Sequence, residues 1–257
     1  MQQVDLNCDM GEDAGESGAQ SDEALMKQVT SINVACGFHA GDSATIHRTV
    51  AAAIKHELAI GAHPGFPDRE GFGRRDMLFA PEEVYAMMVY QIGAVQAFAA
   101  AQGGRLSHVK PHGALYNRAA KDAAWAEAVA EAVYRVDGSL ILYGLSGSEM
   151  VRAGERIGLR TANEVFADRM YEEDGSLTPR SIEGAVLTDS AAAAEQAVRM
   201  VLNGEVVTRG GKLLKLRTDT ICIHGDTPGA EAHSIALRQA LREAGIHVSR
   251  ADQIALN

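Results

Sequence analysis

The stretch Leu106-Ser-His-Val-Lys-Pro-His-Gly-Ala-Leu-Tyr-Asn117 begins like a buried strand, and the strand leads into a lysine and a histidine. Because strand side chains alternate between two faces, His108, Lys110 and His112 are expected on one face. Pro111 cannot donate a hydrogen bond to a neighbouring strand, so the strand should end there and leave His112 at its mouth. A lysine and a histidine at that end suit a site that handles negative charge, although such groups also have structural roles.

Six further strands are predicted, and most of them also end in polar side chains. They are expected at Val4–Asp9, Ile32–Gly37, Leu58–Ala62, Leu140–Gly144, from about Leu159 to Asn163, and Thr220–Ile223. Helical spacing and capping residues predict helices between them. These are expected at Asp22–Val29 with Ser21 as N-cap, from Asp42 or Ser43 to Ile54, Pro81–Ala101, Asp122–Tyr134, from Ser146 onward, Asp189–Leu202, and from Thr227 or Pro228 to Ala244.

The alternation of strand and helix implies a parallel sheet with right-handed crossovers. An open doubly wound sheet has the same element order, but two features favour a barrel. Polar side chains follow at least six strands rather than one switch point, and no Gly-x-Gly-x-x-Gly follows the first strand. Since no composition break marks a linker, we expect a single α/β domain over residues 1–257. A hairpin at 206–214, a last short strand at 246–248 and an excursion over 171–187 lie outside this scheme.

A barrel would gather the strand ends into one bowl lined by ionisable side chains. Its expected rim is Asp9, His39, His63, Lys110, His112, Glu164, Asp168, His224 and Asp226. Any one of them could be structural, but burying so many charges without a function is costly. One fitting chemistry is a divalent metal held by Asp9, His39 and His63, because imidazole and carboxylate suit zinc or manganese. The other is metal-free acid–base catalysis, with carboxylates as bases and Lys110 and the histidines stabilising an anion.

A long loop, Phe66–Leu78, contains the sequence Gly71-Phe-Gly-Arg-Arg75. A structureless loop of this length in a domain often covers a site. Either Arg74 or Arg75 could bind a substrate carboxylate through its guanidinium fork, although a solvated turn would have the same composition.

Composition and motifs exclude several classes of function. The formal net charge of −10, with no basic run, argues against nucleic acid. No secretory leader and no apolar run of bilayer length is apparent, so no membrane partner is expected. The three cysteines, Cys8, Cys36 and Cys222, have no metal-site spacing and are expected as buried thiols in a cytoplasmic protein. The zincin and α/β-hydrolase motifs are also missing.

Several longer motifs of the chain resemble those of one known family, the LamB/YcsF family. The resemblance covers nearly the whole chain and rests on Asp5-Leu-Asn-Cys-Asp-Met-Gly-Glu12, Ala35-Cys-Gly-Phe-His-Ala-Gly-Asp42, Gly61-Ala-His-Pro-Gly65, Gly71-Phe-Gly-Arg-Arg75, Val109-Lys-Pro-His-Gly-Ala-Leu-Tyr-Asn117, Glu164-Val-Phe-Ala-Asp-Arg169 and His224-Gly-Asp226. It implies a TIM-like seven-stranded (β/α) barrel related to the glycoside hydrolase/deacetylase superfamily. It further implies that the 5-oxoproline lactam is opened to L-glutamate with ATP hydrolysis, together with subunits B and C.

Within that reaction we assign hypothetical roles to residues of the bowl. Lys110 and His112 would hold phosphate or an oxyanion, Asp9 would activate water, and Arg74 or Arg75 would bind the substrate carboxylate. The full candidate set is Asp9, Lys110, His112, Glu164, Asp168, His224 and Asp226 for catalysis, Asn7, Arg74 and Arg75 for substrate, and Asp9, His39 and His63 for a metal.

Two other functions stay open at the level of sequence. One is a metal-dependent deacetylase or amidase acting on a sugar, although the paired-histidine motif of such deacetylases is missing after His63, where Pro-Gly-Phe-Pro follows. The other is a non-catalytic scaffold with a vestigial bowl, which is hard to reconcile with so many ionisable groups at the strand ends.

Overall fold

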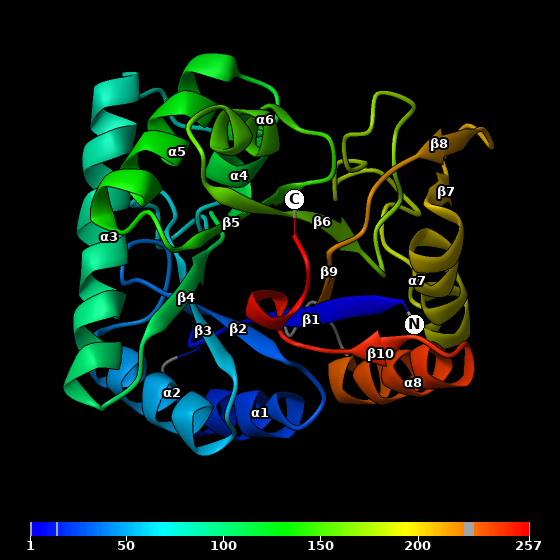
Figure 1. Cartoon of the computed structure of the whole chain (residues 1–257), viewed down its shortest axis with the longest axis horizontal. Coiled ribbons are helices and arrows are strands. Elements are labelled where there is room, and N and C mark those ends of the chain that lie inside the picture. The colour runs from blue at the N-terminus through cyan, green and yellow to red at the C-terminus, as the bar shows by residue number, and fades with distance from the viewer. Residues whose placement is uncertain (1, 14, 224–228, 257) are drawn as a thin grey trace.

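Seven parallel strands form a closed barrel in the computed structural model, which describes residues 2–13, 15–223 and 229–256 (Figure 1). The barrel strands are β1 (Gln3–Met10), β2 (Ser31–Ala35), β3 (Ala59–His63), β4 (Leu106–Val109), β5 (Ile141–Leu145), β6 (Arg160–Phe166) and β9 (Thr220–Ile223). They pair in this order, and β9 closes the ring by pairing with β1, where Asp5 lies opposite Thr220. The predicted seven-stranded TIM-like (β/α) barrel is therefore confirmed.

Helices surround the barrel and follow its strands along the chain (Figure 1). They are α1 (Glu16–Met26), α2 (Ser43–Lys55), α3 (Pro81–Ala101), α4 (Gly113–Ala119), α5 (Ala123–Val136), α6 (Glu149–Arg156), α7 (Ser190–Asn203) and α8 (Ala230–Glu243). Three helices begin after an aspartate whose carboxylate accepts from a backbone N–H of the first turn: Asp42, Asp122 and Asp189. Such caps satisfy amide groups that have no partner inside the helix.

Two predicted helix starts were wrong. Helix α1 begins at Glu16 rather than after Ser21, and the Asp22 carboxylate instead accepts a hydrogen bond from Gly11 N at 2.8 Å. Helix α6 is capped by Ser148 rather than Ser146, whose hydroxyl accepts from the backbone of Arg217. Asp22 and Ser146, which lie where the sequence predicted the helix starts, thus make hydrogen bonds to other parts of the chain. Helix α4 was not predicted, because seven residues show no periodicity; the start predicted at 227 or 228 lies outside the described residues.

Short elements extend the barrel at both ends. The predicted hairpin is formed by β7 (Glu205–Val207) and β8 (Leu213–Lys215), and β10 (His247–Val248) adds to the outer edge of β1. After the 3-10 turn η1 (Ala251–Gln253), the C-terminal segment packs beneath the barrel, where Ala251 and Leu256 join the apolar cluster of β5 and β6. The segment between β6 and α7 contains no helix or ladder strand and lies near the opposite, C-terminal ends of the strands (Figure 1).

The barrel interior is polar, whereas its outer face is apolar. On β1, the side chains of Leu6 and Cys8 belong to the hydrophobic core shared with the helices. The alternate residue Asp5 points inward and accepts hydrogen bonds from the hydroxyls of Thr220 at 2.6 Å and Tyr143 at 3.0 Å. Barrels of this class usually fill their interior with branched aliphatic residues. Here the layers are hydrogen-bonded instead, and burial raises the pKa of Asp5.

Helix α3 is the one element among the described residues that has the length and apolar composition of a membrane span. Core helices of globular proteins pass the same test. Here α3 packs against α5 and β3, and it buries Val84, Met88 and Ile92 completely.

The glycine at position 61 of β3 makes room for a buried imidazole. The His108 ring stacks on Tyr143 at 4.2 Å between centroids, and its Nε2 lies 2.8 Å from Asn33 Oδ1. Burial lowers the pKa of His108 to about 3, so the ring is neutral. A Cβ atom on Gly61 would overlap that ring, and the β3–β4 register shifts at this point.

We expect Gly61→Ala to destabilise the fold by about 1–3 kcal/mol or more, the usual cost of overpacking a core. The matched control is Gly93→Ala in α3, where an added Cβ meets nothing within 4 Å. That change should leave stability unchanged or raise it by up to about 1 kcal/mol, because alanine favours a helix. The free energy of unfolding in urea is measured for both variants. Equal stabilities would contradict the close packing of His108 against Gly61.

Candidate active site

The ammonium group of Lys110 is buried between two carboxylates at the C-terminal ends of three strands. Lys110 Nζ lies 2.9 Å from Asp9 Oδ1 and 3.0 Å from Glu164 Oε1. It also donates to Asn7 Oδ1 at 3.2 Å and contacts Cys222 Sγ at 3.0 Å. All of these side chains come from β1, β6 or β9, or from the residue that follows β4. Asn7 and Asp9 are alternate residues of β1, so both side chains lie on one face of the strand, where they contact Lys110.

This arrangement fixes the protonation states of the cluster. Burial alone would disfavour the ammonium, but the neighbouring Asp9, Cys222 and Glu164 groups hold the pKa of Lys110 well above its ordinary value. Burial also opposes ionisation of Asp9, but His63 and Lys110 hold the pKa of Asp9 well below its usual range. Burial raises the pKa of the Cys222 thiol. At neutral pH the cluster is an ammonium, a carboxylate at Asp9 and a neutral thiol.

Three histidines and Glu12 form a second cluster beside Asp9. The rings of His39 and His112 stack at 3.8 Å between centroids, and His63 packs edge-on against both. Glu12 Oε1 lies 3.1 Å from His39 Nε2 and 3.3 Å from His112 Nδ1. One ligand atom from each of the four residues lies within 4.8 Å of the others, so the group could hold a metal ion.

The glycine-rich loop 71–75 supports this histidine cluster from above. Phe72 has a positive φ of 54°, a rare conformation for a side chain of this size, and its carbonyl accepts from His112 Nε2 at 2.8 Å. Gly73, with φ of 63°, lies so close to His39 and His112 that a Cβ would approach them to 2.8 and 2.9 Å. The loop is therefore part of the site rather than a solvated turn.

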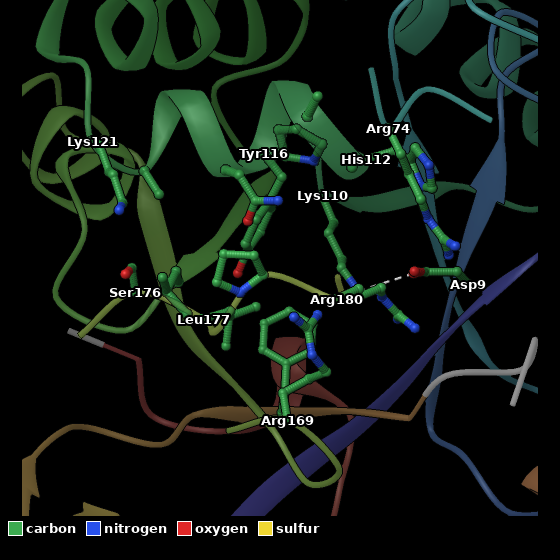
Figure 2. A pocket seen from close by; sticks show the side chains of 18 of the residues that line it. Asp9, Arg74, Lys110, His112, Tyr116, Lys121, Arg169, Ser176, Leu177 and Arg180 are labelled. Carbon is green, nitrogen blue, oxygen red and sulfur yellow. Dashed lines mark hydrogen bonds and ion pairs between the residues drawn. The ribbon is translucent and has the colours of Figure 1, made fainter. Parts of the chain in front are cut away.

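A cavity of about 400 Å³ opens above the two clusters (Figure 2). Asp9, His63, Lys110 and His112 line its floor, and Tyr116 from α4 lines one wall. Four cationic side chains also line it, among apolar residues such as Leu145, Phe166 and Leu177: Arg74, Lys121, Arg169 and Arg180. Figure 2 shows these side chains converging on the cavity from several elements. The volume is in the range of small-molecule sites.

Arg169 and Arg180 come from the segment between β6 and α7, and Arg169 anchors that segment. The Arg169 guanidinium is buried and donates to the carbonyl oxygens of Thr178 at 2.6 Å and Ala185 at 3.4 Å. Burial, followed by repulsion from Arg180, lowers the pKa of Arg169 to about 10. Two neighbouring guanidinium groups with no carboxylate hydrogen-bonded to Arg169 among the described residues make this wall suited to an anion.

The structure brings together some predicted site residues and separates others. Asp9, His63, Lys110, His112 and Arg74 line the cavity, with Asn7 and Glu164 directly beneath Lys110. Arg75 instead pairs with Asp68 and is largely exposed, and Asp168 lines a small separate cavity near α7 and α8, because the chain turns after Phe166. His224 and Asp226 lie outside the described residues. Of the predicted metal set, His39 and His63 lie in a group with Glu12 and His112 that could hold a metal ion. Asp9 lies beside this group, and its Oδ1 accepts from Lys110 and Asn33.

Five residues of the site were not predicted from the sequence: Glu12 beside the histidines, Tyr116 on helix α4, and the cavity-lining cations Lys121, Arg169 and Arg180. Glu12 does follow Asp9 in an acidic run, which could have indicated it. No local signal marks Arg180, because it reaches the cavity only through the fold of the long segment.

Comparisons with known proteins agree with this geometry. The sequence model of the LamB/YcsF family matches residues 4–256. The chain belongs to the LamB/YcsF family. A protein of Brevibacillus brevis, named as the A component of 5-oxoprolinase, is 55% identical over 249 residues, which cover 97% of this chain and 98% of that protein. The protein of the same name from Bacillus subtilis is 52% identical, with 97% of each chain covered.

Among solved structures, the lactam utilization protein of Thermus thermophilus has the same fold as this LamB/YcsF chain. The two superpose with a TM-score of 0.89 at 46% identity, over 96% of this chain and 99% of that one.

Replacing Lys110 should destabilise the LamB/YcsF barrel, because its removal leaves two carboxylates buried without a cation. We expect Lys110→Met to cost about 3–5 kcal/mol. The double variant Lys110→Met/Glu164→Gln should recover part of that loss. The control is Lys212→Met, which breaks an exposed pair with Glu173 and should cost less than about 1 kcal/mol. Urea unfolding measures all three; a Lys110→Met variant as stable as the control would show that the ammonium is not needed for folding.

Proposed function

We propose that the chain is the A component of an ATP-dependent 5-oxoprolinase, a hydrolase that opens the lactam of 5-oxoproline to L-glutamate while ATP is hydrolysed to ADP and phosphate. The observation that carries this proposal is the small cavity that is lined by four cationic side chains and whose floor holds a preorganised carboxylate–ammonium cluster. The names of the relatives from Brevibacillus brevis and Bacillus subtilis support the same reaction.

The cationic wall suits the carboxylate of the substrate. 5-Oxoproline is a small anion, and a guanidinium fork pairs with a carboxylate through two hydrogen bonds. Arg180 is exposed at the cavity, and Arg169 lies beside it with its position fixed by two backbone carbonyls. We therefore assign the carboxylate to this pair, with Arg74 as a further cation of the cavity lining. Arg75 is not assigned to substrate, because its guanidinium is paired with Asp68.

One buried group on the cavity wall has capacity left for the lactam. Tyr116 lines the cavity, and its Oη has no hydrogen bond of ordinary geometry to the described residues. Burial and the nearby Glu164 carboxylate raise the pKa of Tyr116 well above its ordinary value, so Tyr116 is a neutral hydroxyl donor. The carbonyl oxygen of the lactam would accept from a donor of this kind.

The reaction needs an activated amide, since a five-membered lactam is stable to water. In the proposed reaction the γ-phosphoryl group of ATP moves to the lactam carbonyl oxygen. ADP leaves as the phosphoryl group is transferred. Water then adds to the ring carbon and the carbon–nitrogen bond opens, which gives the amino group and an acyl phosphate. A second water hydrolyses the acyl phosphate to the carboxyl group of glutamate and inorganic phosphate. Asp9 is the acceptor that orients the water through Oδ2, because Oδ1 accepts from Lys110 and Asn33, whereas Oδ2 has a longer contact of 3.3 Å with His63 Nε2. Lys110 acts mainly by holding Asp9 ionised rather than by binding the oxyanion itself.

We assign ATP activation to an assembly of this chain with subunits B and C in the cytoplasm. The sequence contains no Walker-type phosphate loop, and the Gly210-Gly-Lys212 stretch lacks that spacing. The name of the relatives also designates one component of a protein with several subunits.

The isolated chain should therefore not turn over 5-oxoproline with ATP, and adding B and C should start the reaction. Glutamate and phosphate are measured together, because the proposal requires one of each per turnover. Full activity of the single chain would contradict the proposal that B and C are needed for ATP activation, and would place ATP binding on the barrel.

In the complex, Arg180→Gln should raise the KM for 5-oxoproline by about 10- to 100-fold with a smaller change in kcat. The physical reason is the loss of one charge-assisted pair in a partly desolvated cavity. Arg135→Gln is the control, since Arg135 pairs with Glu131 on the surface of α5. A KM that is unchanged in Arg180→Gln, with the complex intact, would place the carboxylate elsewhere.

The metal-dependent amidase or deacetylase alternative is favoured by one observation, the Glu12 and histidine group at the cavity floor. It makes a different prediction for the isolated chain. Release of acetate from N-acetylated sugar oligomers, without ATP and without other subunits, would support that alternative over the lactam reaction.

A further inference from the structure

Two histidine nitrogens face each other across 2.9 Å at the floor of the cavity. They are Nε2 of His63 and Nδ1 of His112. Such a contact is stable only if a proton or a cation lies between the two atoms, since two lone pairs at this distance repel. Which of these applies depends on where each ring carries its own proton.

Backbone carbonyl groups fix that position in both rings. His63 Nδ1 lies 2.7 Å from the carbonyl oxygen of Lys110, and His112 Nε2 lies 2.8 Å from that of Phe72. A carbonyl oxygen only accepts hydrogen bonds, so each of these nitrogens must carry a hydrogen. A neutral imidazole has a single N–H, so when both rings are neutral the two facing nitrogens both present lone pairs and the contact needs a cation between them. When one ring is protonated, the proton lies between them instead.

Two further groups that could ligate a cation lie beside these two nitrogens. Glu12 Oε1 lies 3.3 Å from His112 Nδ1 and 3.9 Å from His63 Nε2. His39 Nε2 is 3.1 Å from the same oxygen, and the other ring nitrogen of His39 is buried without a hydrogen-bond partner. The pocket thus offers three imidazole nitrogens and one carboxylate oxygen, all within 4.8 Å of one another.

We propose that this pocket binds one divalent transition-metal ion, of the zinc or manganese type, through Glu12 Oε1, His39 Nε2, His63 Nε2 and His112 Nδ1. Bonds of about 2.0–2.2 Å place neighbouring ligand atoms of a tetrahedral ion about 3.3–3.6 Å apart, close to the separations seen here. Metal-bound histidines characteristically donate their second N–H to a carbonyl or carboxylate. His63 and His112 both have that outer contact already in place.

The binding site differs from the one that the sequence suggested, and it does not depend on the proposed lactam reaction. Asp9 remains next to the ion through the 3.3 Å contact of its Oδ2 with His63 Nε2, but its other oxygen is engaged by Lys110. The cysteines take no part, and all three are buried free thiols.

The test uses the full chain, purified without chelator and then stripped with one. Mass spectrometric metal analysis should find about one zinc or manganese ion per chain before stripping. The stripped protein should bind Zn²⁺ or Co²⁺ with one-to-one stoichiometry in calorimetry. Bound Co²⁺ should give the visible absorption of a low-symmetry nitrogen and oxygen site, and added Zn²⁺ should raise the Tm.

Variants separate ligands from bystanders. Glu12→Gln, His63→Ala and His112→Ala should each weaken Zn²⁺ binding at least about a hundredfold, more than outer-sphere changes usually do. The control is His47→Ala, an exposed histidine of α2 outside the group, which should bind as the wild type does. Circular dichroism checks that every variant is folded.

A folded wild-type chain that holds no metal as purified and binds neither Zn²⁺ nor Co²⁺ would overturn the proposal. The facing nitrogens would then share a proton instead. Binding that survives in all three variants would also overturn it, because the ion would lie elsewhere. Since none of these readouts is turnover, a failed lactam assay leaves this inference intact, and the reverse also holds.

Discussion

The buried ammonium of Lys110 is the contact on which the site of this barrel depends. It links the floor of the cavity to three parts of the closed sheet, through Asp9 and Asn7 on β1, Glu164 on β6 and Cys222 on β9. Ionised groups inside a protein are costly unless they are paired and hydrogen-bonded, and here each partner has further polar neighbours. The ammonium group that pairs with the buried carboxylates also helps to keep Asp9 ionised at the cavity.

This dependence explains why the barrel is filled with polar side chains. Asp5, Asn7 and Asp9 form successive inward steps along β1, and each receives hydrogen bonds from neighbouring strands. A connected network of buried hydrogen bonds is rigid, because moving one member leaves the others without partners in a low dielectric. The LamB/YcsF chain therefore holds its reactive groups with the same bonds that hold the strands in register.

Backbone carbonyls provide a second kind of control over the site. The carbonyls of Lys110 and Phe72 set the orientation and the tautomer of two histidines. The second of these carbonyls belongs to Phe72, which has a positive φ and lies between two glycines of the loop. The stacked rings leave no room for larger side chains at Gly65 or Gly73, where a Cβ would approach His39 to 2.6 and 2.8 Å. The loop and the histidines consequently form one packed unit.

Local signals in the sequence were sufficient to predict the strand order and the inward-facing residues. Apolar runs of strand length, period-two alternation and aspartate caps are such signals, and they located the seven barrel strands and the bounds of α3. Alternation also placed His108, Lys110 and Asp9 on the interior faces, because a strand has only two faces. The LamB/YcsF motifs added the family, which the comparisons confirm.

Which of the inward residues meet could be learned only from the folded chain. Arg75 and Arg74 are neighbours in sequence, yet a pair with Asp68 directs Arg75 away from the cavity. Asp168 leaves the site because β6 ends at Phe166 and the chain turns, whereas Arg180 enters it from a segment with no periodic pattern. The grouping of Glu12 and His112 with His39 and His63 has the same cause. Contacts between side chains depend on the distances between strands and loops that are remote in sequence, and periodicity contains no information about those distances.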